Sequence, residues 1–204
     1  MDKIQKINKE YYDKNAELWS ASKTNSFYQE EPFRKFVKYL KMGNSVLDIG
    51  CSHGVHVPLF LGIGRDLKYE GLDISKKFLS ISISRYPQLK FIYGDISDKK
   101  TLPNKKYDAF WAAMVLMHIP EENWSAMLDN LERLVKNGGI GYLTLPKERP
   151  YPESKIDRRH FNLFDNKKFL RIAKERKWKI LNSGKLLSSN KKTEWLWYII
   201  RLPK

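Results

Sequence analysis

A glycine turn followed by an acidic residue is the part of the chain best suited to ligand chemistry. The turn runs from Gly50 to Gly54, directly after the strand-like stretch 45–49, and Asp73 lies 23 positions beyond Gly50. Glycine lets the backbone turn sharply and come close to a ligand. An acid about 20 residues after such a turn can accept two hydrogen bonds from a ribose diol. The spacing therefore predicts a nucleoside site at the carboxyl edge of a parallel sheet.

Two other interpretations of the turn have to be compared with this one. Glycines at strand–helix junctions can serve the backbone geometry alone, which would make Gly50 and Gly54 structural. A dinucleotide site would need the spacing Gly-x-Gly-x-x-Gly, which the turn lacks. The joint pattern favours cofactor binding, because it adds three acids around the turn: Asp48, Asp73 and Asp95.

These motifs resemble those of the class I S-adenosylmethionine-dependent methyltransferases. The first motif of that family reads Asp-x-Gly-x-Gly-x-Gly, and residues 48–54 match it except that Ser52 replaces the middle glycine. Residues 71–75 resemble the second motif, whose acid binds the ribose hydroxyls. Residues 91–96 resemble the third motif, whose acid faces the adenine amino group.

Later segments extend the resemblance over nearly the whole chain. Residues 107–114 resemble the fourth strand, and the loop 115–120 would close under the methionine part of the cofactor. The resemblance implies S-adenosylmethionine as cofactor and S-adenosylhomocysteine as product. The cofactor-binding residues that it implies are Asp48, Gly50, Cys51, Ser52, Gly54, Asp73, Ile74, Asp95, Ile96, Met114 and Trp19.

Two histidines are the candidate catalytic residues. Alignment of nucleophile, methyl group and leaving sulfur supplies much of the rate in methyl transfer, but an oxygen or nitrogen nucleophile can still need a base. His118 is the first candidate, because its loop would lie under the methyl group and histidine titrates near neutral pH. His160 is the second. The alternative role for His118 is to anchor the loop before Pro120. No metal site is expected, since no cluster of cysteine and histidine is present.

Composition limits the class of protein. A chain of 204 residues with 42% hydrophobic residues fits one α/β domain, residues 1–204. No apolar run approaches 18 residues, the N-terminus has no signal-like apolar core, and the single cysteine cannot form an internal disulfide. A cytoplasmic protein with no membrane contact is expected.

The net charge is strongly positive. The chain has 38 basic and 23 acidic residues, a formal net charge of +15. Such an excess attracts nucleic acid. However, the basic pairs are spread through the chain and no appended nucleic-acid module is visible, so a small-molecule partner is favoured over RNA or DNA.

The expected elements alternate as in an α/β fold. Residues 1–40 are predicted to form a helical cap, in which Ile4, Ile7, Tyr11 and Leu18 share one face. Residues 41–204 are predicted to form a Rossmann-like, seven-stranded, mostly parallel sheet with an antiparallel edge strand and helices on both faces. The expected strands are 45–49, 68–72, 89–93, 107–112, 139–145, 178–187 and 194–201, and the expected core helices are 54–63, 75–85, 121–136 and 165–177.

Two segments besides the loop after residue 112 can reach the acceptor side of the pocket. The cap carries the aromatic residues Tyr11, Tyr12, Trp19, Phe27 and Tyr28. They either form a lid over the cofactor or only pack the cap helices against the sheet. The long polar segment after residue 145 carries Tyr151, Arg158, Arg159, His160 and Phe161, and its length favours function over mere connection.

The sequence thus predicts a methyltransferase that acts on an oxygen or nitrogen of a small molecule. One alternative is an RNA or protein methyltransferase that uses the basic surface. The other is a protein that binds S-adenosylmethionine without turnover. The oligomeric state stays open.

Overall fold

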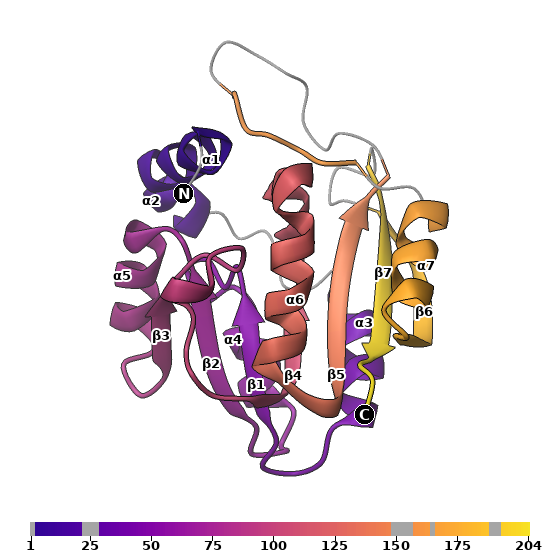
Figure 1. The fold of residues 1–204 in the computed structure, drawn as a ribbon. Helices are drawn as coiled ribbons and strands as arrows, with labels where there is room; N and C mark the ends of the chain where they lie inside the picture. The colour runs from indigo at the N-terminus through magenta and orange to yellow at the C-terminus, as the bar shows by residue number, and fades with distance from the viewer. Residues whose placement is uncertain (1–2, 22–28, 148–156, 164–165, 188–192) are drawn as a thin grey trace.

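The computed structural model describes residues 3–21, 29–147, 157–163, 166–187 and 193–204. Its strands are β1 (Ser45–Ile49), β2 (Lys68–Asp73), β3 (Lys90–Tyr93), β4 (Tyr107–Ala112), β5 (Val135–Pro146), β6 (Lys179–Leu187) and β7 (Glu194–Arg201). They form one sheet in the order β3-β2-β1-β4-β5-β7-β6 (Figure 1). Strands β1 to β5 are parallel, and β7 is antiparallel to both of its neighbours. The predicted mostly parallel sheet with an antiparallel hairpin at one edge is confirmed.

Helices cover both faces of the sheet because its strands alternate between two apolar layers. Leu47 and Ile49 of β1 belong to the apolar cluster that also contains the buried side chains of α6 (Trp124–Leu134) and α7 (Asn166–Glu175). Val46 of the same strand packs on the opposite face with α3 (Glu30–Phe36) and α4 (Val57–Gly62). A parallel sheet that is buried on both faces in this way needs continuous apolar strands, which these are.

Of the predicted cap, residues 1–40, only α1 (Lys3–Lys14) and α2 (Ala16–Ala21) lie at the upper end of the molecule in Figure 1, beside α5 (Lys76–Arg85). The prediction is wrong for α3, whose apolar residues pack on the sheet. The predicted apolar face of the cap is wrong in part. Leu18 is 71% exposed, whereas Gln5 and Asn8 are each only 5% exposed. The reason is that α1 lies over loops rather than on the sheet, so its buried side meets polar backbone groups.

Other boundaries differ from the sequence prediction by a few residues. The helix expected over 121–136 begins with a short 3-10 turn, η5 (Glu121–Asn123), and its end belongs to β5. Strand β5 begins at Val135 rather than at residue 139, with an irregular pairing to β4 before Ile140. Three further 3-10 turns are η2 (Val37–Tyr39), η3 (Lys99–Thr101) and η4 (Leu116–His118). Within the described residues, no helix is long and apolar enough to cross a membrane.

The centre of the sheet leaves no room for a side chain at Gly141 of β5. A Cβ atom there would lie 2.3 Å from Cε1 of Phe110 and 3.0 Å from Cγ1 of Ile200. We expect Gly141→Ala to lower the free energy of unfolding by about 1–3 kcal/mol, because the buried ring has to leave its place. Chemical denaturation measures this loss.

Gly62 at the end of α4 is the matched control, since nothing lies within 4 Å of the position of its Cβ atom. Gly62→Ala is expected to leave stability unchanged or to raise it slightly. Equal losses in the two variants would contradict the close packing at Gly141.

Candidate functional site

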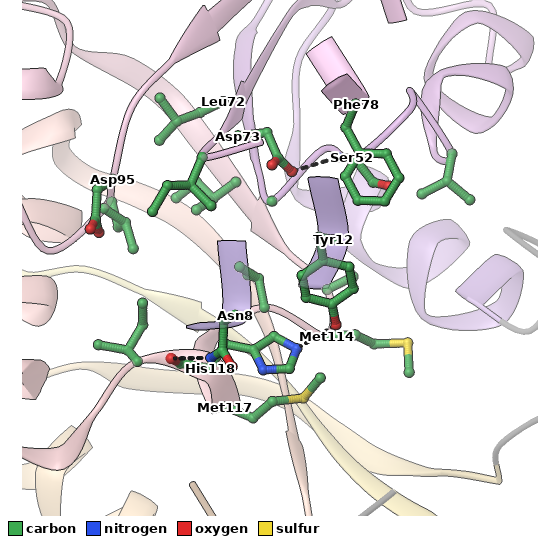
Figure 2. A pocket seen from close by; sticks show the side chains of 18 of the residues that line it. Asn8, Tyr12, Ser52, Leu72, Asp73, Phe78, Asp95, Met114, Met117 and His118 are labelled. Atoms are coloured by element: carbon green, nitrogen blue, oxygen red, sulfur yellow. Dashed lines mark hydrogen bonds between the residues drawn. The ribbon is translucent and has the colours of Figure 1, made fainter. Parts of the chain in front are cut away.

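A cavity of about 310 Å³ lies at the carboxyl ends of β1 to β4, under α1. In Figure 2, Asp73 and Asp95 lie across this cavity from His118 and Met117. Nine of the residues predicted for the site line it: Trp19, Gly50, Ser52, Asp73, Ile74, Asp95, Ile96, Met114 and His118. The predicted residues Asp48, Cys51, Gly54 and His160 are not among the lining residues. Phe27, Tyr28 and Tyr151 lie outside the described residues.

The turn after β1 needs glycine at its first position. Gly50 has a φ of +71°, and a Cβ atom there would lie 2.6 Å from Cβ of Val115 in the loop after β4. Ser52 and Met114 also have positive φ angles, 53° and 59°. Such conformations cost about 1–3 kcal/mol each in residues other than glycine and gather at ligand sites. Here both strained residues line the cavity.

Asp73 connects the ends of β1 and β2. Its carboxylate accepts hydrogen bonds from the backbone N–H groups of Ser52 and Ser75, each at 2.8 Å. Burial raises the pKa of Asp73 from 3.8 to about 6, although these hydrogen bonds oppose the shift. A carboxylate has about four acceptor sites, so Asp73 keeps capacity for ligand hydroxyl groups.

Asp95 has one oxygen atom without a partner. Its Oδ1 accepts hydrogen bonds from the backbone N–H and the hydroxyl of Ser97, whereas Oδ2 is buried and unpaired. A buried acceptor without a partner costs about 1–3 kcal/mol. An amino group of a bound ligand would remove that cost, and the apolar side chains of Ile74 and Ile96 line the same cavity.

The three predicted turn residues that do not line the cavity are packed behind its wall. Asp48 is fully buried and accepts a hydrogen bond of 2.9 Å from the hydroxyl of Tyr69. Burial, with the nearby Asp73 and Asp48, raises the pKa of the Cys51 thiol well above its ordinary value. This thiol is therefore unsuited to act as a nucleophile.

His118 lies in a chain of hydrogen bonds with both ring nitrogens engaged. Its Nδ1 donates to the backbone carbonyl of His160 at 2.9 Å, because a carbonyl can only accept. Its Nε2 therefore accepts from the hydroxyl of Tyr12 at 2.7 Å, and that hydroxyl accepts from Nη1 of Arg159 at 2.9 Å. Burial lowers the pKa of His118 from 6.5 to about 3. The neutral-pH titration expected from the sequence is absent at this position.

Arg159 joins the cap to the segment after β5. Its guanidinium is 2% exposed and donates two hydrogen bonds to Asp157, Nε–Oδ1 at 2.9 Å and Nη2–Oδ2 at 2.6 Å. Four aromatic rings of α1, α2 and the same segment surround it at 4.3–5.6 Å from their centroids: Tyr11, Tyr12, Trp19 and Phe161. The cation–π contacts stabilise this buried charge.

Sequence reasoning missed the polar residues on the underside of α1. Gln5 Nε2 donates to Ser97 Oγ at 2.5 Å, and Asn8 donates to the carbonyl of His118 and accepts from the N–H of His160. Gln5, Asn8 and Tyr12 recur at helical spacing on one face, which was the available signal. Polar residues at this spacing ordinarily indicate a side of the helix that faces solvent, whereas here they face the loops.

Two further histidines line the cavity beside the glycine turn. Burial, together with Arg85, lowers the pKa of His53 from 6.5 to about 4. His56 lies 3.6 Å from Asp48 through its Nδ1. The described residues hold no group of three or more His, Cys, Asp or Glu side chains that could hold a metal ion.

The cavity fits the adenosine part of S-adenosylmethionine. Asp73 has carboxylate oxygens of the kind that a ribose diol could bond to, and the unpaired Oδ2 of Asp95 is an acceptor that an amino group could use. Gly50 and the strained Ser52 bring backbone close to the ligand space.

The comparisons with known proteins agree with this geometry. Residues 46–139 match the family model described as a methyltransferase domain. This segment therefore resembles a methyltransferase domain, and the whole chain shares the fold of solved S-adenosylmethionine-dependent methyltransferases. The resemblance drawn from the sequence motifs is confirmed. No curated protein sequence matches the chain.

Solved structures with low sequence identity share the fold. The 1,6-didemethyltoxoflavin-N1-methyltransferase of Burkholderia thailandensis has a TM-score of 0.78 at 12% identity, and the match covers 98% of this chain and 88% of that one. The magnesium protoporphyrin IX methyltransferase of Synechocystis PCC 6803 with bound SAH has a TM-score of 0.74 at 17% identity, covering 97% and 99%. The [4+2]-cyclase SpnF has a TM-score of 0.73 at 15% identity, covering 98% and 96%.

Asn8 tests how α1 is held over the cavity. Asn8→Ala removes an acceptor from the N–H of His160 and a donor from the carbonyl of His118. We expect amide hydrogen exchange in α1 to speed up by at least about tenfold, since each lost buried hydrogen bond costs about 1–3 kcal/mol. Mass spectrometry of exchanging peptides measures this effect. Exchange in β1 and β4 serves as the internal control, and unchanged exchange in α1 would contradict the tether.

The pKa of His118 predicts a pH dependence of stability. Because the folded value of about 3 lies below the unfolded value of 6.5, the unfolded chain binds more protons between these pH values. The stability contributed by the neutral imidazole is therefore present above pH 6.5 and is lost as the pH falls toward 3. We expect His118→Gln to weaken the fall in the free energy of unfolding between about pH 7 and about pH 4.5.

Urea denaturation across that range measures the two slopes. Asp73 acts in the opposite direction, because its raised pKa means that stability is lost as the pH rises through about 6. Since Asp73 is present in both proteins, comparing wild type with His118→Gln isolates the contribution of His118. Parallel curves would contradict the shifted pKa.

Proposed function

We propose that this protein is an enzyme that transfers the methyl group of S-adenosylmethionine to a small molecule. The single observation that carries the proposal is the pairing of Asp73, which still has acceptor capacity, with the unpaired Oδ2 of Asp95 in one cavity. The methyltransferase domain match over residues 46–139 supports it. The chain would work as one domain, and in a reducing compartment such as the cytoplasm, since its one cysteine is a free, buried thiol.

Different residues of the chain would bind different parts of the cofactor. Asp73 would accept hydrogen bonds from the ribose hydroxyls, and Asp95 would accept one from the adenine amino group, with Ile74 and Ile96 against the base. Gly50 and Ser52 would present backbone to the methionine part. When bound, the cofactor supplies an activated methyl group on a sulfonium. The chain's own contribution is then to orient the acceptor and to exclude water.

A small acceptor is favoured by the size of the site. The cavity of about 310 Å³ lies at the low end of the range of roughly 300–1,000 Å³ typical of ligand pockets. Helix α1 covers it through hydrogen bonds with the loops after β3 and β4. The net charge of +15 alone is a weaker argument for a nucleic-acid acceptor, because a polymer would have to displace α1 to reach the methyl group.

Calorimetric titration with S-adenosylmethionine and S-adenosylhomocysteine tests the cofactor assignment. We expect micromolar binding by the wild type and about ten- to hundredfold weaker binding by Asp73→Asn, because hydrogen bonds to a charged acceptor contribute about 1.5–3 kcal/mol. Asp66→Asn is the matched control, since Asp66 is exposed and does not line the cavity. If the intact protein bound neither compound, the proposed function would lose its basis.

A further inference from the structure

The two ends of the cavity carry opposite charge. Among the described residues that line it, only three side chains are formally charged: Asp73, Asp95 and Arg159. Asp73 ends β2 and Asp95 follows β3, where the proposed function places the adenosine. Arg159 belongs to the segment that contacts His118 and Tyr12, on the acceptor side. No carboxylate among the described lining residues faces the acceptor.

The aromatic rings on the acceptor side already surround a cation. Cages of this kind bind quaternary ammonium groups when they are open. Here the guanidinium of Arg159 lies 4.3 Å from the ring centroid of Tyr11, 5.6 Å from that of Trp19 and 5.2 Å from that of Phe161. A cationic acceptor therefore finds neither a free cage nor an opposite charge at this end.

In the ion pair of Arg159 with Asp157, the positive member is the one that lies in the cavity wall. Arg159 lines the cavity and Asp157 does not. At the neighbouring His118, Arg159 lowers the imidazole pKa by more than Asp157 raises it. The arginine therefore dominates the field of the pair at that point of the wall.

A second, independent feature is a buried hydrogen-bond donor without a partner. Trp195 of β7 is 1% exposed and lines the same cavity, and its Nε1 has no hydrogen-bond partner. An indole N–H can only donate. The cost of leaving it unpaired is removed by a ligand that brings an acceptor atom, such as a carboxylate or phenolate oxygen. The apolar wall beside it is formed by Met114 and Met117.

We propose that the methyl acceptor is a small, largely apolar molecule whose reacting group is an anionic or readily ionised oxygen, a carboxylate or a phenol, and not a cationic amine. This inference rests on the proposed function and narrows it. A lone pair of the oxygen forms the new C–O bond to the methyl carbon. The C–S bond breaks with its electron pair going to sulfur, so the anion and the sulfonium yield two neutral products.

Such an acceptor does not need His118 as a base. Both nitrogens of His118 are engaged, and the ring stays neutral down to low pH. An oxygen that is already ionised has no proton to give up in the transfer step. A positive wall next to the sulfonium favours that ionised form.

Matched probes test the charge preference on protein that is saturated with S-adenosylhomocysteine. Phenylacetate, 2-phenylethanol and phenethylamine share a ring and differ mainly in the charge of the terminal group. Saturation-transfer NMR measures their dissociation constants. We expect phenylacetate to bind at least about tenfold more tightly than phenethylamine, a difference of about 1.4 kcal/mol. With S-adenosylmethionine in place of S-adenosylhomocysteine, transfer to the amine nitrogen would overturn the inference.

Three variants distinguish the effect of the Arg159 charge in the cavity wall from the effect of the basic surface as a whole. Arg159→Lys keeps the charge and loses the forked geometry, so it is expected to keep the preference, whereas Arg159→Gln is expected to lose it. Arg158→Gln removes the same charge from an exposed neighbour and controls for binding to the basic surface. Equal or tighter binding of the amine by wild type, or a preference that survives in Arg159→Gln, would overturn the inference. Failure of S-adenosylhomocysteine to bind at all would count against the proposed function instead.

Discussion

The parallel direction of β1 to β4 is the constraint on which the site depends. Because these strands run the same way, the loops that follow them emerge at one edge of the sheet. Asp73 ends β2 and Asp95 follows β3, while Gly50 and His118 follow β1 and β4. Residues that are up to 68 positions apart in the chain, from Gly50 to His118, thereby line one cavity. The apolar layers on both faces keep that edge rigid.

A helix that covers this edge of the sheet has to provide hydrogen-bond partners for the loops beneath it. Loops carry backbone N–H and C=O groups that need partners once water is excluded. The chain meets this need with α1, whose buried side is polar rather than apolar. Asn8 satisfies the carbonyl of His118 and the N–H of His160, and Gln5 bonds to Ser97. These hydrogen bonds hold the cap over the loops, together with the contacts of its aromatic rings with Arg159 and Phe78.

Arg159 places a buried positive charge in the wall of the cavity. Its ion pair with Asp157 and its four aromatic neighbours connect the cap to the segment after β5. The same fold occurs in methyltransferases and in a [4+2]-cyclase, so the sheet alone does not determine the reaction. The reaction therefore has to depend on the side chains around the cavity, among them Arg159 and the unpaired N–H of Trp195.

The sequence by itself determined the sheet, the glycine turn and the two acids of the cofactor side. These features depend on local patterns: apolar strands, a glycine at positive φ, and an acid at a fixed distance along the chain. Only the tertiary structure decided the acceptor side. The neutral state of His118, the polar underside of α1 and the cage around Arg159 arise from contacts between segments as far apart as Tyr12 and Arg159. Burial and charge at those contacts depend on three-dimensional packing, which no local pattern in the chain records.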